Sequence, residues 1–218
     1  MKRFVIIGLG NFGSSVAEAL HARGHDVVAV DVEEHAVDRI APYVTRAAVG
    51  DGRQMEVLER LGAKEADGGI VSAGDDITAS ILATMALRDL KVKDIYVKVV
   101  SRDHARVMAR IGVSETIFPE RESALNLGIR LSSGDVFNYV RLGGGFSMQE
   151  MAVPDKWEGK TLRELGLRQH YRLSVIAVHD VLMQTMHVPP DPDAVLKDSD
   201  TLLVAGRDEN LERVAKMK

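Results

Sequence analysis

The chain has 218 residues and contains no cysteine. Disulfide frameworks, thiolate metal sites and cysteine nucleophiles are therefore excluded, and this absence is typical of a cytoplasmic protein. The chain also lacks any stretch approaching the roughly 18 consecutive apolar residues of a membrane-spanning helix. Its amino terminus leads directly into a strand-like segment instead of a signal peptide. We therefore expect a soluble, cytoplasmic protein.

The charged residues give no indication of a nucleic-acid partner. The formal net charge is −4, whereas a nucleic-acid-binding surface requires a clustered basic face. Hydrophobic residues make up 45% of the sequence, which is enough for well-packed cores. At about 100–200 residues per domain, the length predicts one large or two small domains.

A glycine-rich segment near the amino terminus gives the first functional signal. The apolar run at residues 4–7 is typical of a strand buried on both faces. It leads into Gly8-x-Gly10-x-x-Gly13, and we predict a helix from Ser14 to about Arg23. In this context Gly8 permits a tight turn, Gly10 lets a pyrophosphate approach, and Gly13 allows close helix packing. The segment therefore predicts a phosphate cradle at a helix start.

An acidic residue supports an adenosine ligand. Asp31 ends the second predicted strand, residues 26–30. A carboxylate there can accept hydrogen bonds from both hydroxyls of an adenosine ribose, and it repels a 2′-phosphate. We therefore predict an adenine nucleotide, with NAD favoured over NADP. The alternative is a Rossmann-type turn that keeps its glycines for packing and has lost its ligand.

Up to residue 118, short apolar runs alternate with helical patterns, which predicts an α/β fold with a Rossmann-like doubly wound parallel sheet. Ligands of such sheets bind beyond the carboxyl ends of the strands. The polar residues and turn glycines at those ends are our candidate ligand-binding residues. They are Asp31, Asp51, Gly74, Asp75 and Lys98. Each of them can instead be a turn former or a solvated charge.

The segment at 120–131 is predicted to be a helix with apolar residues on two faces. We interpret it as a dimerisation helix rather than an ordinary buried one. Breaks at Ser132-Ser133-Gly134 and at the glycines of 143–145 mark a change of character. We therefore predict a nucleotide-binding domain at 1–134, including this helix, and a small α+β domain at 135–218.

The second predicted domain carries no dense catalytic constellation. A dehydrogenase needs a proton donor or acceptor beside the nicotinamide, and no such group is evident, so we do not expect an enzyme. An NAD-dependent oxidoreductase remains the alternative. We interpret His179, Met183, Met186 and His187 as an ordinary hairpin instead of a metal site, and we expect Trp157 to pack between the domains.

The order of these motifs resembles one family across almost the entire chain. It resembles the cytoplasmic regulatory subunits of bacterial potassium transporters of the Ktr and Trk types, which are built from an RCK domain (regulator of potassium conductance). The matching stretches are VIIGLGNFG, GHDVVAVD, VGDG, IYVKVVSRDHARVMARIGV and IFPERE in the first lobe, and WEGKTLRELGLRQHYRLSVIAV and DTLLVAG in the second. Each stretch alone is unspecific, but their order is specific.

The resemblance implies a gating ring. RCK subunits pair, and in Ktr systems they typically form octamers that dock on a membrane-embedded potassium-translocating subunit at the inner face of the plasma membrane. Adenine nucleotides, ATP, ADP or NAD(H), bind in the crevice and switch transport. The implied ligand residues are Gly8, Gly10, Asn11, Phe12, Gly13, Asp31, Asp51, Gly74 and Lys98, and Glu120 is the implied site for Mg²⁺ or Ca²⁺.

The chain departs from this family at two positions. Many members carry arginine at the position of Asn11, so we expect weak discrimination of a γ-phosphate here. Ser80 replaces an asparagine that is common in NAD-binding members. The resemblance also implies that Arg168 and Tyr171 hold cyclic di-AMP in the second lobe, with a solvated turn as the alternative.

Overall fold

The computed structural model describes residues 1–132 and 135–217, so the predicted break at Ser133-Gly134 lies outside the described residues. The chain forms two compact units, Met1–Pro119 and Glu120–Lys218. The sequence instead places the domain boundary after residue 134. The assignment of the connecting helix to the first domain therefore stays a prediction.

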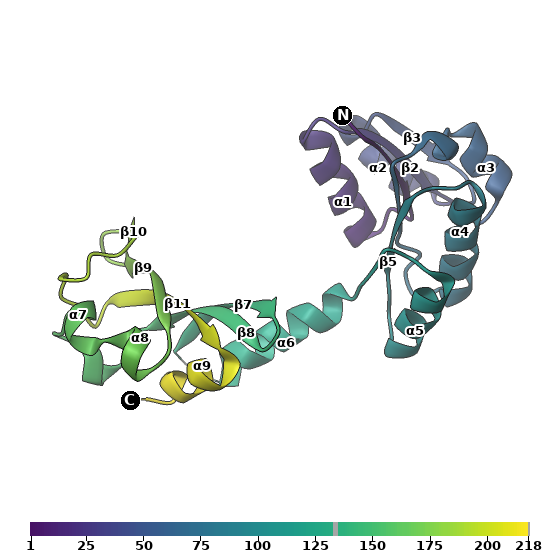
Figure 1. Cartoon of the computed structure of the whole chain (residues 1–218). Coiled ribbons are helices and arrows are strands. Elements are labelled where there is room, and N and C mark those ends of the chain that lie inside the picture. The colour runs from purple at the N-terminus through teal and green to yellow at the C-terminus, as the bar shows by residue number, and fades with distance from the viewer. Residues whose placement is uncertain (133–134, 218) are drawn as a thin grey trace. The chain divides into compact units, whose positions relative to one another are not determined.

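The first unit is a sheet with helices on both faces (Figure 1). Its helices and strands are β1 (Arg3–Ile7), α1 (Asn11–Ala22), β2 (Asp26–Asp31), α2 (Glu34–Ile40), β3 (Arg46–Val49), α3 (Met55–Arg60), β4 (Gly68–Val71), α4 (Ile77–Asp89), β5 (Asp94–Lys98), α5 (Arg102–Ile111) and β6 (Glu115–Ile117), with short 3₁₀ turns at Ala41–Tyr43 and Ala63–Glu65.

All strands of this unit pair in parallel, in the order β3-β2-β1-β4-β5-β6. Ile7 of β1 lies opposite Val30 of β2 and Val71 of β4. Because the pairing is parallel, the carboxyl ends of all these strands lie at the same edge of the sheet. The predicted Rossmann-like sheet is therefore confirmed.

Two apolar layers cover the faces of this sheet. On one face, Val5 of β1 belongs to a core with Leu87 of α4 and Met108 of α5. On the other face, Ile6 belongs to a core with Ala17 of α1. Full burial of a side chain such as Leu87 contributes about 1.5–3 kcal/mol. Because consecutive residues of β1 pack into opposite layers, the strand is a continuous apolar run.

The second unit contains an antiparallel sheet in the order β10-β9-β11-β8-β7. The elements are β7 (Val136–Gly143), β8 (Phe146–Ala152), a 3₁₀ turn at Asp155–Trp157, α7 (Leu162–Leu165), α8 (Leu167–His170), β9 (Ser174–Asp180), β10 (Thr185–His187), β11 (Asp200–Arg207) and α9 (Asp208–Ala215). Along β8, Ser147, Gln149 and Met151 are buried while their neighbours are partly exposed. This alternation is typical of a sheet with one buried face, and the antiparallel sheet with its helices confirms the predicted α+β domain.

Trp157 corrects one expectation. We expected it between the domains, but it is 1% exposed within the core of the second unit. Its ring lies 5.2 Å from that of Tyr171 in an edge-to-face arrangement, a favoured geometry for aromatic pairs. The prediction was wrong because a single tryptophan in a sequence does not reveal which core it fills.

Helix α6 (Pro119–Ser132) connects the two sheets in the chain, and none of its residues is buried. Leu125, Leu127 and Leu131 are 37%, 46% and 76% exposed. The helix and its apolar surface therefore follow the prediction from the sequence. A helix in water that exposes several leucines commonly marks a protein contact.

Candidate nucleotide site

The glycine turn joins β1 to α1 as the motif predicts. Gly8 has a φ of 91°, a conformation that glycine adopts readily and other residues do not. Its N–H donates a hydrogen bond to the carbonyl oxygen of Val30 at 2.9 Å. A Cβ at Gly8 would lie 2.1 Å from the carbonyl oxygen of Ser72. Gly8 therefore lets the chain turn while it touches the end of β4.

Helix α1 begins at Asn11 rather than at Ser14, so the predicted start was wrong. Asn11, Phe12 and Gly13 form its first turn. A Cβ at Gly13 would lie 1.9 Å from the carbonyl oxygen of Gly8. The last glycine of the motif therefore belongs to the helix itself, and it is the residue that allows α1 to approach β1 so closely.

The start of α1 presents main-chain donors to open space. The first N–H groups of a helix have no acceptor within the helix, and Gly10 at the N-cap supplies no side chain to cap them. A Cβ at Gly10 would meet no heavy atom of the described residues within 4 Å. A phosphate that reaches this turn therefore meets N–H groups and the positive end of the helix dipole.

Asp31 lies beside this turn at the end of β2. Its Oδ2 accepts a hydrogen bond from the N–H of Leu9 at 2.5 Å, and its Oδ1 accepts one from the N–H of Glu33 at 2.9 Å. Each carboxylate oxygen can accept more than one hydrogen bond. The main chain therefore fixes the orientation of Asp31 and leaves it acceptor capacity for ribose hydroxyls.

The sequence did not identify Arg39 as a site residue. From α2, its Nη2 donates a hydrogen bond to the carbonyl oxygen of Leu9 at 3.2 Å. The same carbonyl oxygen accepts a hydrogen bond from the hydroxyl of Ser14 at 2.9 Å. Only the tertiary arrangement of α2 beside the turn brings this guanidinium to the cradle, and no motif in the sequence indicates it.

Asp51 follows β3 and is held by its neighbour. Oxygens Oδ1 and Oδ2 of Asp51 lie 2.8 Å from Nε and Nη2 of Arg53, a bidentate pair. The N–H of Arg53 also donates to Oδ1 at 3.0 Å. The hydrogen bond from the Arg53 guanidinium is the main cause that lowers the pKa of Asp51. Asp51 is therefore a carboxylate already paired within the described residues.

The loop after β4 contains the predicted residues Gly74 and Asp75. Gly74 has a φ of 60°, and Asp75 is exposed. The neighbouring Asp76 forms the N-cap of α4, where its Oδ1 accepts a hydrogen bond from the N–H of Ala79 at 2.8 Å. The sequence favoured Asp75 as a ligand residue but did not separate it from the capping role of Asp76.

The remaining predicted residues of the site lie on two elements. Lys98 is the last residue of β5 and is partly buried, which places it at the carboxyl edge of the sheet. Glu120 lies in the first turn of α6 and is exposed. Among the described residues, no group of three or more His, Asp or Glu side chains is arranged to hold a metal ion.

In the second unit, Arg168 lies on α8 and is exposed. Tyr171 caps the end of the same helix and packs against Trp157. The guanidinium of Arg213 lies 5.9 Å from the centre of the Tyr171 ring. Tyr171 is therefore partly engaged in packing, whereas Arg168 is presented to solvent.

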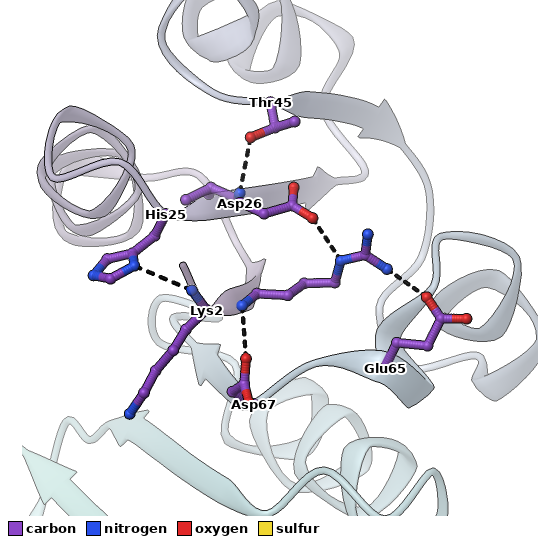
Figure 2. A network of polar contacts seen from close by, with 8 residues as sticks. Lys2, His25, Asp26, Thr45, Glu65 and Asp67 are labelled. Atoms are coloured by element: carbon purple, nitrogen blue, oxygen red, sulfur yellow. Dashed lines mark hydrogen bonds and ion pairs between the residues drawn. The ribbon is translucent and has the colours of Figure 1, made fainter.

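The opposite edge of the first sheet carries a separate polar network (Figure 2). Nε of Arg3 lies 2.6 Å from Oδ2 of Asp26, and its Nη1 lies 2.5 Å from Oε2 of Glu65. The N–H of Arg3 donates to Oδ2 of Asp67 at 2.8 Å, and the hydroxyl of Thr45 accepts from the N–H of Val27 at 3.0 Å. These contacts tie together the amino ends of β1 and β2 and the turns that precede β3 and β4.

A groove of about 880 Å³ lies at this amino-terminal edge. Its lining includes Arg3, Asp26 and Arg46, the first residues of β1, β2 and β3. None of the residues of the glycine turn lines it. Because parallel strands place their amino and carboxyl ends at opposite edges, this groove is distinct from the phosphate cradle.

Within the described residues, no helix is both long and apolar enough to cross a membrane.

Two family models match the chain. The TrkA-N domain matches residues 4–119, and the TrkA-C domain matches residues 148–218. These matches define a class of two-lobed proteins with a Rossmann-type first lobe. Ktr system potassium uptake protein C of Bacillus subtilis (strain 168) is 33% identical over 215 residues, which cover 99% of this chain and 96% of that protein. The chain belongs to the TrkA-N/TrkA-C family that includes the Ktr potassium uptake proteins.

Solved structures share the fold. The RCK domain of GsuK aligns with a TM-score of 0.69 and 21% identity, covering 99% of this chain and 47% of that chain. This likeness confirms the fold that the resemblance to RCK domains implied. The AMP-bound CTD of Shewanella denitrificans Kef aligns with a TM-score of 0.53 and 26% identity, covering 60% of this chain and 80% of that chain.

Proposed function

We propose that this chain is the nucleotide-binding regulatory subunit of a potassium uptake system. An adenine nucleotide, ATP, ADP or NAD(H), binds at the glycine turn and switches transport through a membrane-embedded potassium-translocating subunit. One observation carries the proposal. The turn has an uncapped helix start and open space at Gly10, with Asp31 held beside it, in a chain that matches a Ktr protein over nearly its full length.

Each group in the site has a distinct role in this proposal. Main-chain N–H groups of residues 10–13 bind the phosphates, and Asp31 binds the ribose hydroxyls. Gly74 and Asp75 flank the adenosine. Lys98 adds positive charge at the same edge of the sheet. Asp51 flanks the nucleoside. Its Oδ2 lies 2.8 Å from Nη2 of Arg53, and this ion pair fixes Asp51 as a hydrogen-bond acceptor.

The proposal places the protein in the cytoplasm, bound to the inner face of the plasma membrane through its partner. The chains pair through α6, whose leucines are exposed, and pairs assemble into a ring. Glu120, in the first turn of that helix, binds Mg²⁺ or Ca²⁺ together with ligands from a second chain. Hard divalent cations prefer such carboxylate oxygens. No catalytic step is required.

Switching follows from differential affinity. A ligand shifts a conformational equilibrium only to the extent that it binds one state better than the other. Moving a population from about 1:99 to about 99:1 requires roughly 5.5 kcal/mol. A ring of several identical sites reaches this value by adding smaller contributions from each chain.

The test is potassium flux through the reconstituted transporter, with the purified chain and either ATP, ADP or NADH. The proposal predicts that potassium flux differs between these nucleotides when the chain is present. When the chain is omitted, the flux should be the same with each nucleotide. Equal flux with all of them would refute nucleotide gating. Sustained oxidation of NADH by the purified chain with a pool of metabolites would instead indicate an oxidoreductase.

A second ligand belongs to the other lobe. We propose that the exposed Arg168 binds a phosphate of cyclic di-AMP, with Tyr171 beside the base. Titration calorimetry of wild-type chain and the Arg168→Gln variant with cyclic di-AMP tests this assignment. We expect heat for the wild type and a loss of affinity of about tenfold for the variant, because a charge-assisted hydrogen bond is removed. Absence of heat at millimolar ligand would rule the site out.

A further inference from the structure

Arg39 is an exposed arginine on α2 with an unusual contact. Its Nη2 donates a hydrogen bond to the carbonyl oxygen of Leu9, 3.2 Å away, in the middle of the glycine turn. Among the described residues, no carboxylate forms an ion pair with it. The positive charge of Arg39 is therefore not neutralised by a neighbouring side chain of this part of the chain.

The main chain of Leu9 binds one negatively charged and one positively charged side chain at the same turn. The N–H of Leu9 donates to Asp31 at 2.5 Å, while its carbonyl oxygen accepts from Arg39. The next residue is Gly10, where a Cβ would meet no heavy atom of the described residues within 4 Å. The guanidinium thus lies one residue from the point where the cradle opens to a phosphate.

The chemistry of the guanidinium suits a phosphate. Arginine carries several N–H donors in a planar fork and is always charged, and the contact with Leu9 uses one of them. Arginine–phosphate pairs are commonly bidentate and stronger than neutral hydrogen bonds. Asp31 already accepts N–H groups from Leu9 and Glu33, so the carboxylate is held by the main chain without help from Arg39.

We propose that Arg39 binds a phosphate of the nucleotide in the cradle and makes the site selective for adenosine phosphates of higher charge. This inference rests on the proposed nucleotide site and names the residue that sets its preference. Asp31 recognises the sugar, and Arg39 recognises the anionic group attached to it. Removing the charge of Arg39 therefore lowers the affinity for phosphorylated ligands and leaves the contact of Asp31 with the nucleoside intact.

The test is titration of the full chain with adenosine, AMP, ADP and NADP⁺, for the wild type and for Arg39→Gln. The matched control is Arg23→Gln, because Arg23 is also exposed and also donates one hydrogen bond to a main-chain carbonyl, that of Ala19 at 2.9 Å. Arg39→Lys keeps the charge without the fork. NADP⁺ is compared with NAD⁺, which lacks only the 2′-phosphate, and an affinity loss in Arg39→Gln that is confined to NADP⁺ would overturn the proposal by placing Arg39 at the ribose 2′ position.

We expect Arg39→Gln to lower the affinity for ADP about tenfold, the usual effect of losing one charge-assisted hydrogen bond. The affinity for adenosine should fall by less than about twofold. Arg39→Lys should retain part of the affinity, and Arg23→Gln all of it. The difference in ADP affinity between the wild type and Arg39→Gln should become smaller at high salt, because ions screen exposed charges.

Equal losses for adenosine and ADP would overturn the proposal, since they would show that Arg39 only braces the turn. Unchanged ADP affinity in Arg39→Gln would also overturn it. If Arg39→Gln does not fold, wild-type affinity for ADP in Arg39→Lys combined with no salt dependence would do the same. A wild-type chain that binds none of these ligands would refute the nucleotide site itself, and the role of Arg39 with it.

Discussion

Single residues of the glycine turn have different physical roles although they are the same amino acid. Gly8 and Gly13 lie so close to main-chain oxygens that a Cβ would fall within 2.1 Å and 1.9 Å of them. Gly10 has open space around its Cα. Gly8 and Gly13 therefore maintain the fold, and Gly10 keeps the cradle accessible. Substitution separates these roles.

Alanine at Gly10 should reduce nucleotide binding without unfolding the protein. The new methyl group projects into open space, so we expect a stability change below about 1 kcal/mol and a loss of nucleotide affinity of at least about tenfold. Alanine at Gly13 should instead lower the unfolding temperature markedly, because its methyl group overlaps the oxygen of Gly8. Thermal unfolding and calorimetry measure both effects, and equal behaviour of the two variants would contradict these roles.

His104 makes the first unit sensitive to acid. It is 1% exposed, and its Nδ1 accepts a hydrogen bond from the N–H of Val100 at 3.4 Å. Its Nε2 has no hydrogen-bond partner among the described residues. Burial lowers the pKa of His104, so the folded state favours the neutral ring. The stability that follows is fully present above the unfolded pKa of about 6.5 and is lost as the pH falls below it.

Urea unfolding at pH 7.5 and pH 5.5 measures this linkage. We expect the free energy of unfolding of the wild type to fall by up to about 1.4 kcal/mol for each pH unit below 6.5, as far as the folded pKa. The variant His104→Leu should show a smaller decrease over the same range. Parallel curves for both proteins would contradict the assignment to His104.

Side chains that act through local main-chain chemistry were predictable from the sequence, and those that act through tertiary contacts were not. The places of Gly8 and Asp31 follow from a strand–turn–helix pattern that fixes backbone geometry. The hydrogen bond from Arg39 to Leu9, 30 residues away in the chain, depends on the position of α2. No spacing rule encodes that contact.

Among the secondary-structure elements, the buried strands were predicted well, whereas one short helix was missed and one helix start was misplaced. The strands β1, β2 and β4 are largely buried, and short apolar runs of this kind are the pattern that predicted the parallel sheet. Helix α8 (Leu167–His170) was missed because a single turn has no periodicity to detect. The start of α1 was misplaced because glycines in a first turn resemble a loop in sequence.

We predict that the exposed leucines of α6 form the contact between two chains. The variant Leu127→Asp/Leu131→Asp places charges where the wild type exposes leucines. We expect it to sediment as a smaller species than the wild type, because the charges would have to be buried in a dimer contact. Its unfolding free energy as a monomer should change by less than about 0.5 kcal/mol.

The control for this helix is Asn126→Asp, which adds a charge at an exposed position of α6 without removing an apolar side chain. It should retain the sedimentation behaviour of the wild type. Analytical ultracentrifugation over a range of concentrations distinguishes the species. A double variant that sediments like the wild type would show that α6 is not the dimer contact.

The amino ends of the strands carry a prediction on stability alone. Arg3→Met removes the ion pairs with Asp26 and Glu65 and keeps most of the side-chain volume. Because partly exposed pairs contribute about 0.2–1 kcal/mol each, we expect a loss of about 0.4–2 kcal/mol in unfolding free energy. Nucleotide affinity should not change, because the network lies at the sheet edge opposite the cradle. A loss of affinity in this variant would contradict that separation.

For the molecule as a whole, the sequence predicted both lobes and the family from the order of motifs. The TrkA-N and TrkA-C matches confirm that reading. The account then makes the first lobe the sensor and the assembly of chains the transmitter of the signal to a membrane partner. The exposed leucines of α6 favour a protein contact at this helix.

The most direct test of nucleotide control is potassium flux through the reconstituted transporter, compared for the wild-type chain and Gly10→Ala at ADP and at ATP concentrations near the wild-type Kd. We predict that flux with the wild type differs between the two nucleotides and that this difference is several times smaller with Gly10→Ala, because its site is mostly empty at these concentrations. A nucleotide-dependent flux that persists unchanged in Gly10→Ala, or equal wild-type flux with ATP and ADP, would contradict this prediction.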